Sequence, residues 1–207
     1  MGIIGKFINQ TRKPEGFLGK MMLKGMNSGH AKMAGWAMGY LGDGKVQRAA
    51  DIGCGGGRNA GELLKKYPAA HVTAVDYSPL SVEKAAEYNK AAIEAGRCTV
   101  MEGDVSDLKL DRNAFDLVTA FETVYFWPGL SKCFSNVAGI LKEGGRFMIV
   151  NESDGTDDTG RKYEKKIEGM KLYTAEVLEK ELRAAGFSDV KVHHYEKKPW
   201  ITVIAEK

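Results

Sequence analysis

Short apolar runs bounded by turn residues recur along the chain and predict β-strands. The runs are rich in β-branched and aromatic residues, and most are apolar on both faces, as in the buried strands of a parallel sheet. They cover residues 46–52, 72–76, 99–101, 115–121, 146–150, 190–195 and 200–205. The pattern therefore predicts seven strands.

Between the first five runs, apolar positions recur every three to four residues, which indicates amphipathic helices. One helix is expected over residues 79–95, with Ser78 as its N-cap, Pro79 in its first position and Gly96 as its stop. Further helices are expected around residues 59–67, from Leu130 to the glycines at 144–145, and from the cap Thr174 to Gly186.

The alternation of strand and helix predicts a parallel sheet with helices on both faces, joined by right-handed crossovers. Residues 190–195 and 200–205 have no helix between them, so these two strands should pair antiparallel. The expected fold is α/β: a Rossmann-like, doubly wound, seven-stranded sheet, mostly parallel, with an antiparallel C-terminal hairpin. In such sheets, ligands bind outside the carboxyl ends of the strands.

The first 41 residues differ from the rest because they are rich in methionine and glycine. Their helical apolar faces are formed by Met21, Met22, Met26, Met33, Trp36, Met38 and Leu41. We expect residues 1–41 to form a helical cap or lid and residues 42–207 to form a single compact domain, since 207 residues suit one domain.

Composition narrows the class of protein. With 43% hydrophobic and 28% charged residues the chain is of ordinary globular type. The net charge of +3 comes from scattered lysine pairs without a dense basic block, so no nucleic-acid partner is expected. Three cysteines without a C-x-x-C pair indicate neither disulfides nor a zinc site and favour a reducing cytoplasm. The N-terminus has no apolar stretch long enough to span a membrane, and the oligomeric state stays open.

The stretch DIGCGGG, residues 51–57, joins the first strand to the next helix and is the strongest local signal for a ligand. Glycines there present backbone N–H groups and let a ligand approach closely. Asp76 ends the second strand, from which a carboxylate can accept both hydroxyls of a ribose. A ribose-containing cofactor is therefore expected.

Two candidate classes of cofactor contain a ribose: a nicotinamide dinucleotide and an adenosyl cofactor without pyrophosphate. The dinucleotide-binding pattern G-x-G-x-x-G is not present from Gly53, because Arg58 stands in the position of its third glycine. The related pattern G-x-G-x-x-A does start at Gly55, so the sequence does not exclude a dinucleotide. Asp51 would repel pyrophosphate but suits an ammonium or sulfonium group. The charge pattern favours the cationic adenosyl cofactor.

Five stretches occur in order from about Val46 onwards: DIGCGGG, AVDYS, GDVSDL, FDLVTAFETVYFW and LKEGGRFMIV. With them the chain resembles the class I S-adenosylmethionine-dependent methyltransferases, and within these the methyltransferase-11 or ubiquinone/menaquinone-biosynthesis-like small-molecule group. Glu143 stands where that family more often has proline. The resemblance implies S-adenosyl-L-methionine as cofactor, S-adenosyl-L-homocysteine as product, and methyl transfer to a small molecule by in-line displacement.

The resemblance also implies which residues hold the cofactor. The glycine loop would hold the methionine end close to Asp51, and Asp76 would bind the ribose. Tyr77 would pack on the adenine, whose edge would meet the Asp104 carboxylate and the Val105 N–H. The full set expected is Asp51, Gly53, Cys54, Gly55, Asp76, Tyr77, Ser78, Gly103, Asp104, Val105, Phe121 and Glu122.

Few catalytic groups are expected, because a sulfonium leaves as a neutral thioether and orientation supplies much of the rate. Glu122, just past the fourth strand, is the candidate for a polar group near the methyl or the acceptor. The alternatives are a structural carboxylate and a partner of the cofactor amino group. Tyr125 could line the acceptor site or only pack, and His30 could orient a ligand or only begin a helix. The acids that follow the fifth strand are interpreted as a solvated loop, so no metal site is expected.

Two other functions stay open. A nicotinamide-dependent oxidoreductase would use the same sheet, but the sequence lacks a recognisable Tyr-x-x-x-Lys pair. A non-catalytic protein that binds the adenosyl cofactor is the third interpretation. Methylation of nucleic-acid amino groups is disfavoured because FETV replaces the Asn/Asp-Pro-Pro-aromatic motif, and the atom methylated, whether O, N, S or C, stays open.

Overall fold

One sheet of seven strands organises residues 30–207, the part of the chain that the structure, a computed structural model, describes. The strand order is β3-β2-β1-β4-β5-β7-β6. The strands are β1 (Arg48–Ile52), β2 (His71–Asp76), β3 (Cys98–Glu102), β4 (Phe115–Phe121), β5 (Leu141–Asn151), β6 (Asp189–His194) and β7 (Ile201–Glu206). All seven were predicted, with shifts of a few residues at their ends.

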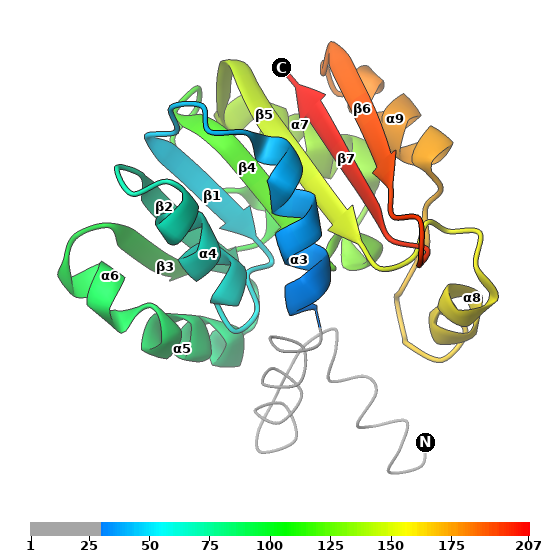
Figure 1. Cartoon of the computed structure of the whole chain (residues 1–207), viewed down its shortest axis with the longest axis horizontal. Helices are drawn as coiled ribbons and strands as arrows, with labels where there is room; N and C mark the ends of the chain where they lie inside the picture. The colour runs from blue at the N-terminus through cyan, green and yellow to red at the C-terminus, as the bar shows by residue number, and fades with distance from the viewer. Residues whose placement is uncertain (1–29) are drawn as a thin grey trace.

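The pairing of the strands confirms the predicted fold class. β1 pairs parallel with β2 and β4, β3 joins β2 and β5 joins β4 in the same sense, while β7 runs antiparallel to both β5 and β6. The carboxyl ends of β1 to β5 therefore lie along one edge of the sheet (Figure 1). This is the edge at which open α/β sheets bind their ligands.

Helices cover both faces of the sheet (Figure 1). On one face lie α3 (Ala31–Met38), α4 (Arg58–Lys66) and α5 (Pro79–Tyr88), and on the other lie α7 (Leu130–Ile140) and α9 (Ala175–Ala184). Side chains alternate along each strand, so Leu117 packs in the core of the first face and Val118 in the core of the second. The two cores together hold in place the strands whose carboxyl ends carry the site residues.

The single helix predicted over residues 79–95 was wrong, because the structure has two helices there. α5 ends at Tyr88, and α6 (Lys90–Glu94) begins after Asn89. The buried Asn89 side chain donates from Nδ2 to the carbonyl oxygens of Gly57 and Ala85, at 2.9 and 3.0 Å. Asparagine competes for backbone hydrogen bonds in this way, and here it ties the end of α5 to the glycine loop.

Two other boundaries differ from the sequence prediction. α7 ends at Ile140, and Leu141 already pairs with Phe115 of β4 ahead of a register shift, so β5 takes up residues expected to be helical. After β5, the expected solvated loop contains the short helix α8 (Asp158–Glu164), capped by Asp157 Oδ1, which accepts the Gly160 N–H at 2.7 Å. Of the predicted caps, Ser78 accepts from Ser81, whereas Thr174 occupies the cap position of α9 without a capping side-chain bond.

The described part of the expected lid packs on the sheet. Met33, Ala34, Ala37, Met38 and Leu41 are buried in the core that also contains residues of β1, α4 and β5. Residues 1–29, with Met21, Met22 and Met26, lie outside the described residues. α3 begins at the edge where β1, β4 and β5 end, which brings His30 to that edge (Figure 1). No helix within residues 30–207 is long and apolar enough to cross a membrane.

Candidate functional site

The residues expected to bind the cofactor lie at the carboxyl ends of four adjacent strands. They follow or end β1 (Asp51, Gly53, Cys54, Gly55), β2 (Asp76, Tyr77, Ser78), β3 (Gly103, Asp104, Val105) and β4 (Phe121, Glu122). The sheet thus brings together residues that are up to about 70 positions apart in the sequence, as expected for parallel strands joined by crossovers.

Asp51 is a buried acid with one free oxygen. Its side chain is 1% exposed, and Oδ1 accepts the Thr119 hydroxyl from β4 at 2.8 Å. Oδ2 is buried and has no hydrogen-bond partner among the described residues. Burial raises the pKa of Asp51 to about 7, with the nearby Asp76 charge adding to it and the Thr119 bond opposing it. Such a carboxylate is stabilised by a positive group placed against Oδ2.

Asp76 joins the glycine loop to the end of β2. Its Oδ2 accepts the Gly55 N–H and its Oδ1 accepts the Ser78 N–H, both at 2.9 Å. Burial raises the pKa of Asp76, although these backbone bonds and the Ser81 side chain act in the opposite direction. A carboxylate has about four acceptor sites, so acceptor capacity for a ribose remains after the contacts with Gly55, Ser78 and Ser81.

Most N–H groups of the glycine loop are used within the protein. The Gly53 and Cys54 amides donate to the Val75 carbonyl at 2.8 and 3.0 Å, and the Gly57 amide donates to the Cys54 carbonyl at 2.9 Å. With the Gly55 amide bonded to Asp76, the loop is held by its own bonds rather than kept open for a ligand. Its contribution to a cofactor is therefore shape and close approach more than free donors.

Two of the glycines are required by packing. Gly53 has φ +76°, and a Cβ there would lie 2.2 Å from the Thr123 hydroxyl oxygen. Gly57 has φ +78°, and its Cβ would lie 2.6 Å from the Ala85 Cα in α5. The glycine pattern that suggested a ligand site thus also reflects the close contact of the loop with α5 and with the segment after β4.

β3 is followed by a turn in which Asp104 is exposed. The Asp104 carboxylate accepts the Ser106 N–H at 2.7 Å and caps a short 3₁₀ helix, Val105–Asp107. Val105 is buried, and its carbonyl accepts from the Asn136 side chain of α7. Gly103 leaves no room for a side chain, because a Cβ would lie 2.8 Å from Val75. Asp104 thus lies just past the end of β3, next to the end of β2.

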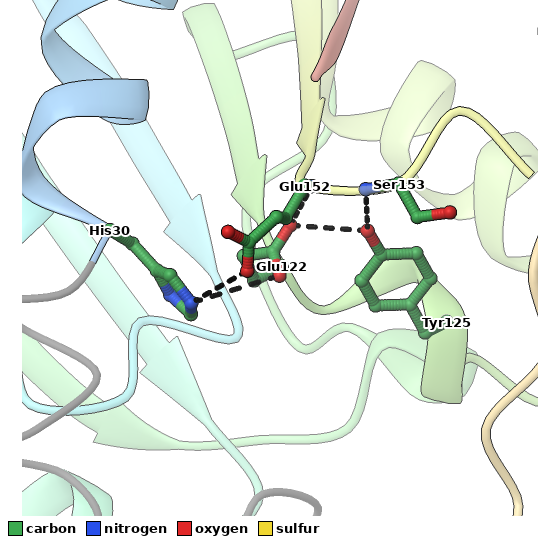
Figure 2. Close-up of polar contacts among 5 residues, drawn as sticks. All are labelled: His30, Glu122, Tyr125, Glu152 and Ser153. Carbon is green, nitrogen blue, oxygen red and sulfur yellow. Dashed lines mark hydrogen bonds and ion pairs between the residues drawn. The ribbon is translucent and has the colours of Figure 1, made fainter. Parts of the chain in front are cut away.

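A second group of polar side chains surrounds Glu122, immediately after β4. Glu122 has φ +58°, in the left-handed region that favours glycine, and its side chain is 13% exposed. Its Oε1 accepts the Tyr125 hydroxyl at 3.2 Å and the Glu152 N–H, while the Tyr125 oxygen accepts the Ser153 N–H at 3.1 Å (Figure 2). Strained backbone of this kind is concentrated at functional sites.

His30 and Glu152 complete this group. The His30 Nε2 lies 3.6 Å from Glu152 Oε2 and 4.0 Å from Glu122 Oε2 (Figure 2). Burial lowers the pKa of His30, but the contact with Glu152 and the charges of both glutamates outweigh it and the pKa is raised. The contact with His30 lowers the pKa of Glu152, whereas burial raises the pKa of Glu122 to about 7 against the opposing charge of His30.

Chemically, the edge divides into two parts. At the ends of β1 and β2, Asp51 and Asp76 present buried carboxylates that fit a cationic nucleoside. At the ends of β4 and β5, a glutamate with a pKa near neutrality lies against a tyrosine hydroxyl and an imidazole. Groups of this kind can bind or deprotonate a polar acceptor. His30, Glu122 and Tyr125, which the sequence proposed separately, lie together.

The sequence analysis missed several residues of this edge. Thr119 holds Asp51, Thr123 packs against Gly53, and Asn89 ties Gly57 to α5. Glu152 lies in the expected exposed loop after β5, but its contact with His30 was not predicted. Its place directly after a buried strand, like that of Glu122, was the available signal. Asn151, which ends β5, is fully buried with neither side-chain polar atom paired among the described residues.

Known proteins that are similar to this chain are methyltransferases. A sequence profile described as "Methyltransferase domain" matches residues 50–149. A sterol 24-C-methyltransferase of Debaryomyces hansenii is 26% identical over 149 residues, which cover 68% of this chain and 39% of that protein. One from Gibberella zeae is 30% identical over 102 residues, covering 49% of this chain and 27% of that protein. The chain spans less than half the length of these curated relatives.

Solved structures share the fold. A putative methyltransferase in complex with the Haloferax volcanii Trm112 methyltransferase activator superposes with a TM-score of 0.80 at 18% identity, covering 89% of this chain and 93% of that one. The phosphoethanolamine N-methyltransferase 2 of Haemonchus contortus, in complex with S-adenosyl-L-methionine, gives 0.74 at 19% identity, covering 86% and 52%.

The profile match over residues 50–149 and the shared fold support the prediction that the chain is a class I S-adenosylmethionine-dependent methyltransferase. S-Adenosyl-L-methionine is the cofactor of this family, and the unpartnered carboxylate oxygen of Asp51 fits its ammonium group. The sequence-based prediction of family and cofactor is thereby confirmed.

Proposed function

We propose that the chain transfers the methyl group of S-adenosyl-L-methionine to a small-molecule acceptor. The observation that carries the proposal is the pair of buried carboxylates at the ends of β1 and β2. Asp51 is fully buried with one oxygen unpaired, and Asp76 lies beside it with acceptor capacity to spare. A buried unpaired carboxylate oxygen is costly unless a ligand pairs with it, and a nucleoside with an ammonium group supplies that partner.

Each end of the cofactor has a proposed partner. Asp51 binds the ammonium group, Asp76 accepts the ribose hydroxyls, and Asp104 with the Val105 N–H meets the edge of the adenine. Gly53, Cys54 and Gly55 form the surface on which the methionine part lies, Phe121 and Gly103 border it, and Tyr77 and Ser78 lie on the adenine side. This arrangement places the sulfonium near the ends of β1 and β4, next to Glu122.

The acceptor occupies the ends of β4 and β5. In-line displacement leaves a neutral thioether, so the protein needs to align the acceptor with the methyl and, for a protic acceptor, remove one proton. Glu122 suits both tasks, with Tyr125 and His30 orienting it. Relatives named for sterol 24-C methylation and phosphoethanolamine N-methylation support a small-molecule acceptor. Three buried free cysteines support a reducing, cytoplasmic location.

Ligand binding and turnover test the proposal in sequence. S-Adenosyl-L-homocysteine should raise the melting temperature of the chain and NADH should not, which separates a methyltransferase from a nicotinamide-dependent oxidoreductase. Radiolabelled S-adenosyl-L-methionine with a panel of small-molecule acceptors should then give labelled product, which separates an enzyme from a non-catalytic binder. A shift with NADH alone would refute the proposal.

A further inference from the structure

Three side chains that can bind metal ions converge at the ends of β4 and β5. His30 directly precedes α3, Glu122 directly follows β4, and Glu152 directly follows β5 (Figure 2). One ligand atom of each, the imidazole nitrogen and a carboxylate oxygen from each glutamate, lies within 4.8 Å of the other two. Of the residues that the structure describes, these three form the one group with such spacing.

The distances from His30 to the two glutamates suit side chains that share a metal ion better than side chains joined by direct hydrogen bonds. His30 Nε2 lies 3.6 Å from Glu152 Oε2 and 4.0 Å from Glu122 Oε2. Hydrogen bonds from N–H to oxygen are about 2.7 to 3.2 Å long, so both contacts are too long to be good ones. Ligand atoms that each lie about 2.0 to 2.2 Å from a metal ion are themselves about 3 to 4 Å apart. The two distances from His30 agree with the second arrangement, and the third pair of ligand atoms lies within 4.8 Å.

Hydrogen bonds behind the cluster already orient Glu122 as a ligand. Its Oε1 is occupied by the Tyr125 hydroxyl and the Glu152 N–H, which leaves Oε2 directed towards His30. The Tyr125 hydroxyl is itself fixed by the Ser153 N–H. Metal-binding carboxylates are typically held by such outer bonds, which fix their orientation before the ion binds.

We propose that His30, Glu122 and Glu152 bind one divalent transition-metal ion such as Mn²⁺, Co²⁺ or Zn²⁺. An imidazole combined with carboxylates suits these ions, whereas Mg²⁺ and Ca²⁺ prefer oxygen ligands alone. Two carboxylates also match the charge of a divalent ion. The prediction of no metal site considered only the acids after the fifth strand, and His30 joins Glu152 only in the folded chain.

The proposed ion has a defined place in the proposed function. Three protein ligands leave coordination positions open, and these positions lie beside the acceptor region at the ends of β4 and β5. If the chain methylates a small molecule there, the ion holds an oxygen atom of the acceptor and so orients it towards the cofactor methyl. This role rests on the proposed function, but the ion site itself does not.

The test is Co²⁺ binding to the full, tag-free chain after removal of metal by chelation, followed by calorimetry and visible absorption. We expect about one equivalent bound, with d–d bands, and at least a tenfold loss of affinity in Glu122→Gln, Glu152→Gln and His30→Ala. Glu143→Gln is the matched control, because this glutamate is 85% exposed at the opposite end of β5 and should bind Co²⁺ like the original chain.

Two outcomes overturn the proposal. One is the absence of stoichiometric Co²⁺, Mn²⁺ and Zn²⁺ binding to the original chain, in which case the cluster is only an imidazolium between two carboxylates. The other is Co²⁺ binding that persists unchanged in all three variants. Urea denaturation shows that each variant is folded, and binding of S-adenosyl-L-homocysteine to the original chain, measured separately, keeps a failure of the metal site distinct from a failure of the proposed methyltransferase function.

Discussion

The two ends of the functional edge are built in different ways. The cofactor end, at β1 and β2, comes from short motifs, and its bonds link neighbouring turns, as between Asp76 and the Gly55 amide. The acceptor end, at β4 and β5, is assembled from His30, Glu122 and Glu152, which lie far apart in the sequence. At the first end most backbone N–H groups of the glycine loop are used within the protein, whereas the second end presents several titratable side chains.

We infer that the two ends have different tasks, one binding the cofactor and the other the acceptor. A cofactor common to a family can be bound by local geometry, so its site is encoded in recognisable motifs. An acceptor that differs from member to member requires side chains that can change without disturbing those motifs. Substitutions at the cofactor end should therefore change stability or cofactor binding strongly, and those at the acceptor end should leave cofactor binding unchanged and alter stability only slightly.

The largest effect on stability is expected for Gly57→Ala. The new methyl group would meet the Ala85 backbone at 2.6 Å in a residue with φ +78°, so overpacking adds to backbone strain. We expect a loss of about 3 kcal/mol in the free energy of unfolding. Gly96→Ala is the control, because its φ is +70° but no atom lies within 4 Å, and it should cost about 1 kcal/mol. Urea denaturation measures both, and equal losses would show that packing of the loop is unimportant.

Asp76→Ala should weaken S-adenosyl-L-homocysteine binding by about a hundredfold or more, because it removes the ribose acceptor and releases the Gly55 and Ser78 amides. Calorimetry measures the affinity. Glu102→Gln serves as control, since Glu102 is the exposed partner of Asp76 on β3 and should have no effect. Similar affinities for Asp76→Ala and the original chain would remove Asp76 from the site.

Asp51→Asn should stabilise the ligand-free chain at high pH. The pKa of Asp51 is about 7 in the folded chain and lower in the unfolded one, so its contribution to stability is full below about pH 4 and is lost as the pH rises through 7. Asparagine stays neutral, and we expect a gain of about 1 to 2 kcal/mol near pH 8 and almost none near pH 4. Urea denaturation at both pH values checks this, and a loss at pH 8 would mean that the carboxylate is already compensated.

A smaller effect is expected for Tyr125→Phe at the acceptor end. The change removes the hydroxyl that donates to Glu122 and leaves the buried Ser153 N–H without an acceptor, at a cost of about 1 kcal/mol. Tyr163→Phe, at a tyrosine that is 48% exposed, is the control and should be neutral. The affinity for S-adenosyl-L-homocysteine should not change. A large loss of affinity would show that the cofactor end and the acceptor end form a single binding site.

The sequence predicted the fold and the cofactor end because both depend on local signals. Apolar runs gave the strands, and Asp51 and Asp76 were recognisable from their places at strand ends. The break at Asn89 was not predictable, because it depends on the bond to the Gly57 carbonyl in another loop. Glu152 does lie in an exposed loop as predicted, but its contact with His30 was missed for the same reason. Its contact with His30 exists only after α3 packs on the sheet, and no periodicity reports that contact.

The central claim is that Asp51 binds the ammonium group of the cofactor. Calorimetric titration of the original chain and Asp51→Asn with S-adenosyl-L-homocysteine and with 5′-methylthioadenosine, which lacks the amino-acid part, tests it directly. We predict that the substitution weakens S-adenosyl-L-homocysteine binding by about tenfold and leaves 5′-methylthioadenosine binding unchanged. Equal losses for both ligands, or no loss for either, would contradict the claim.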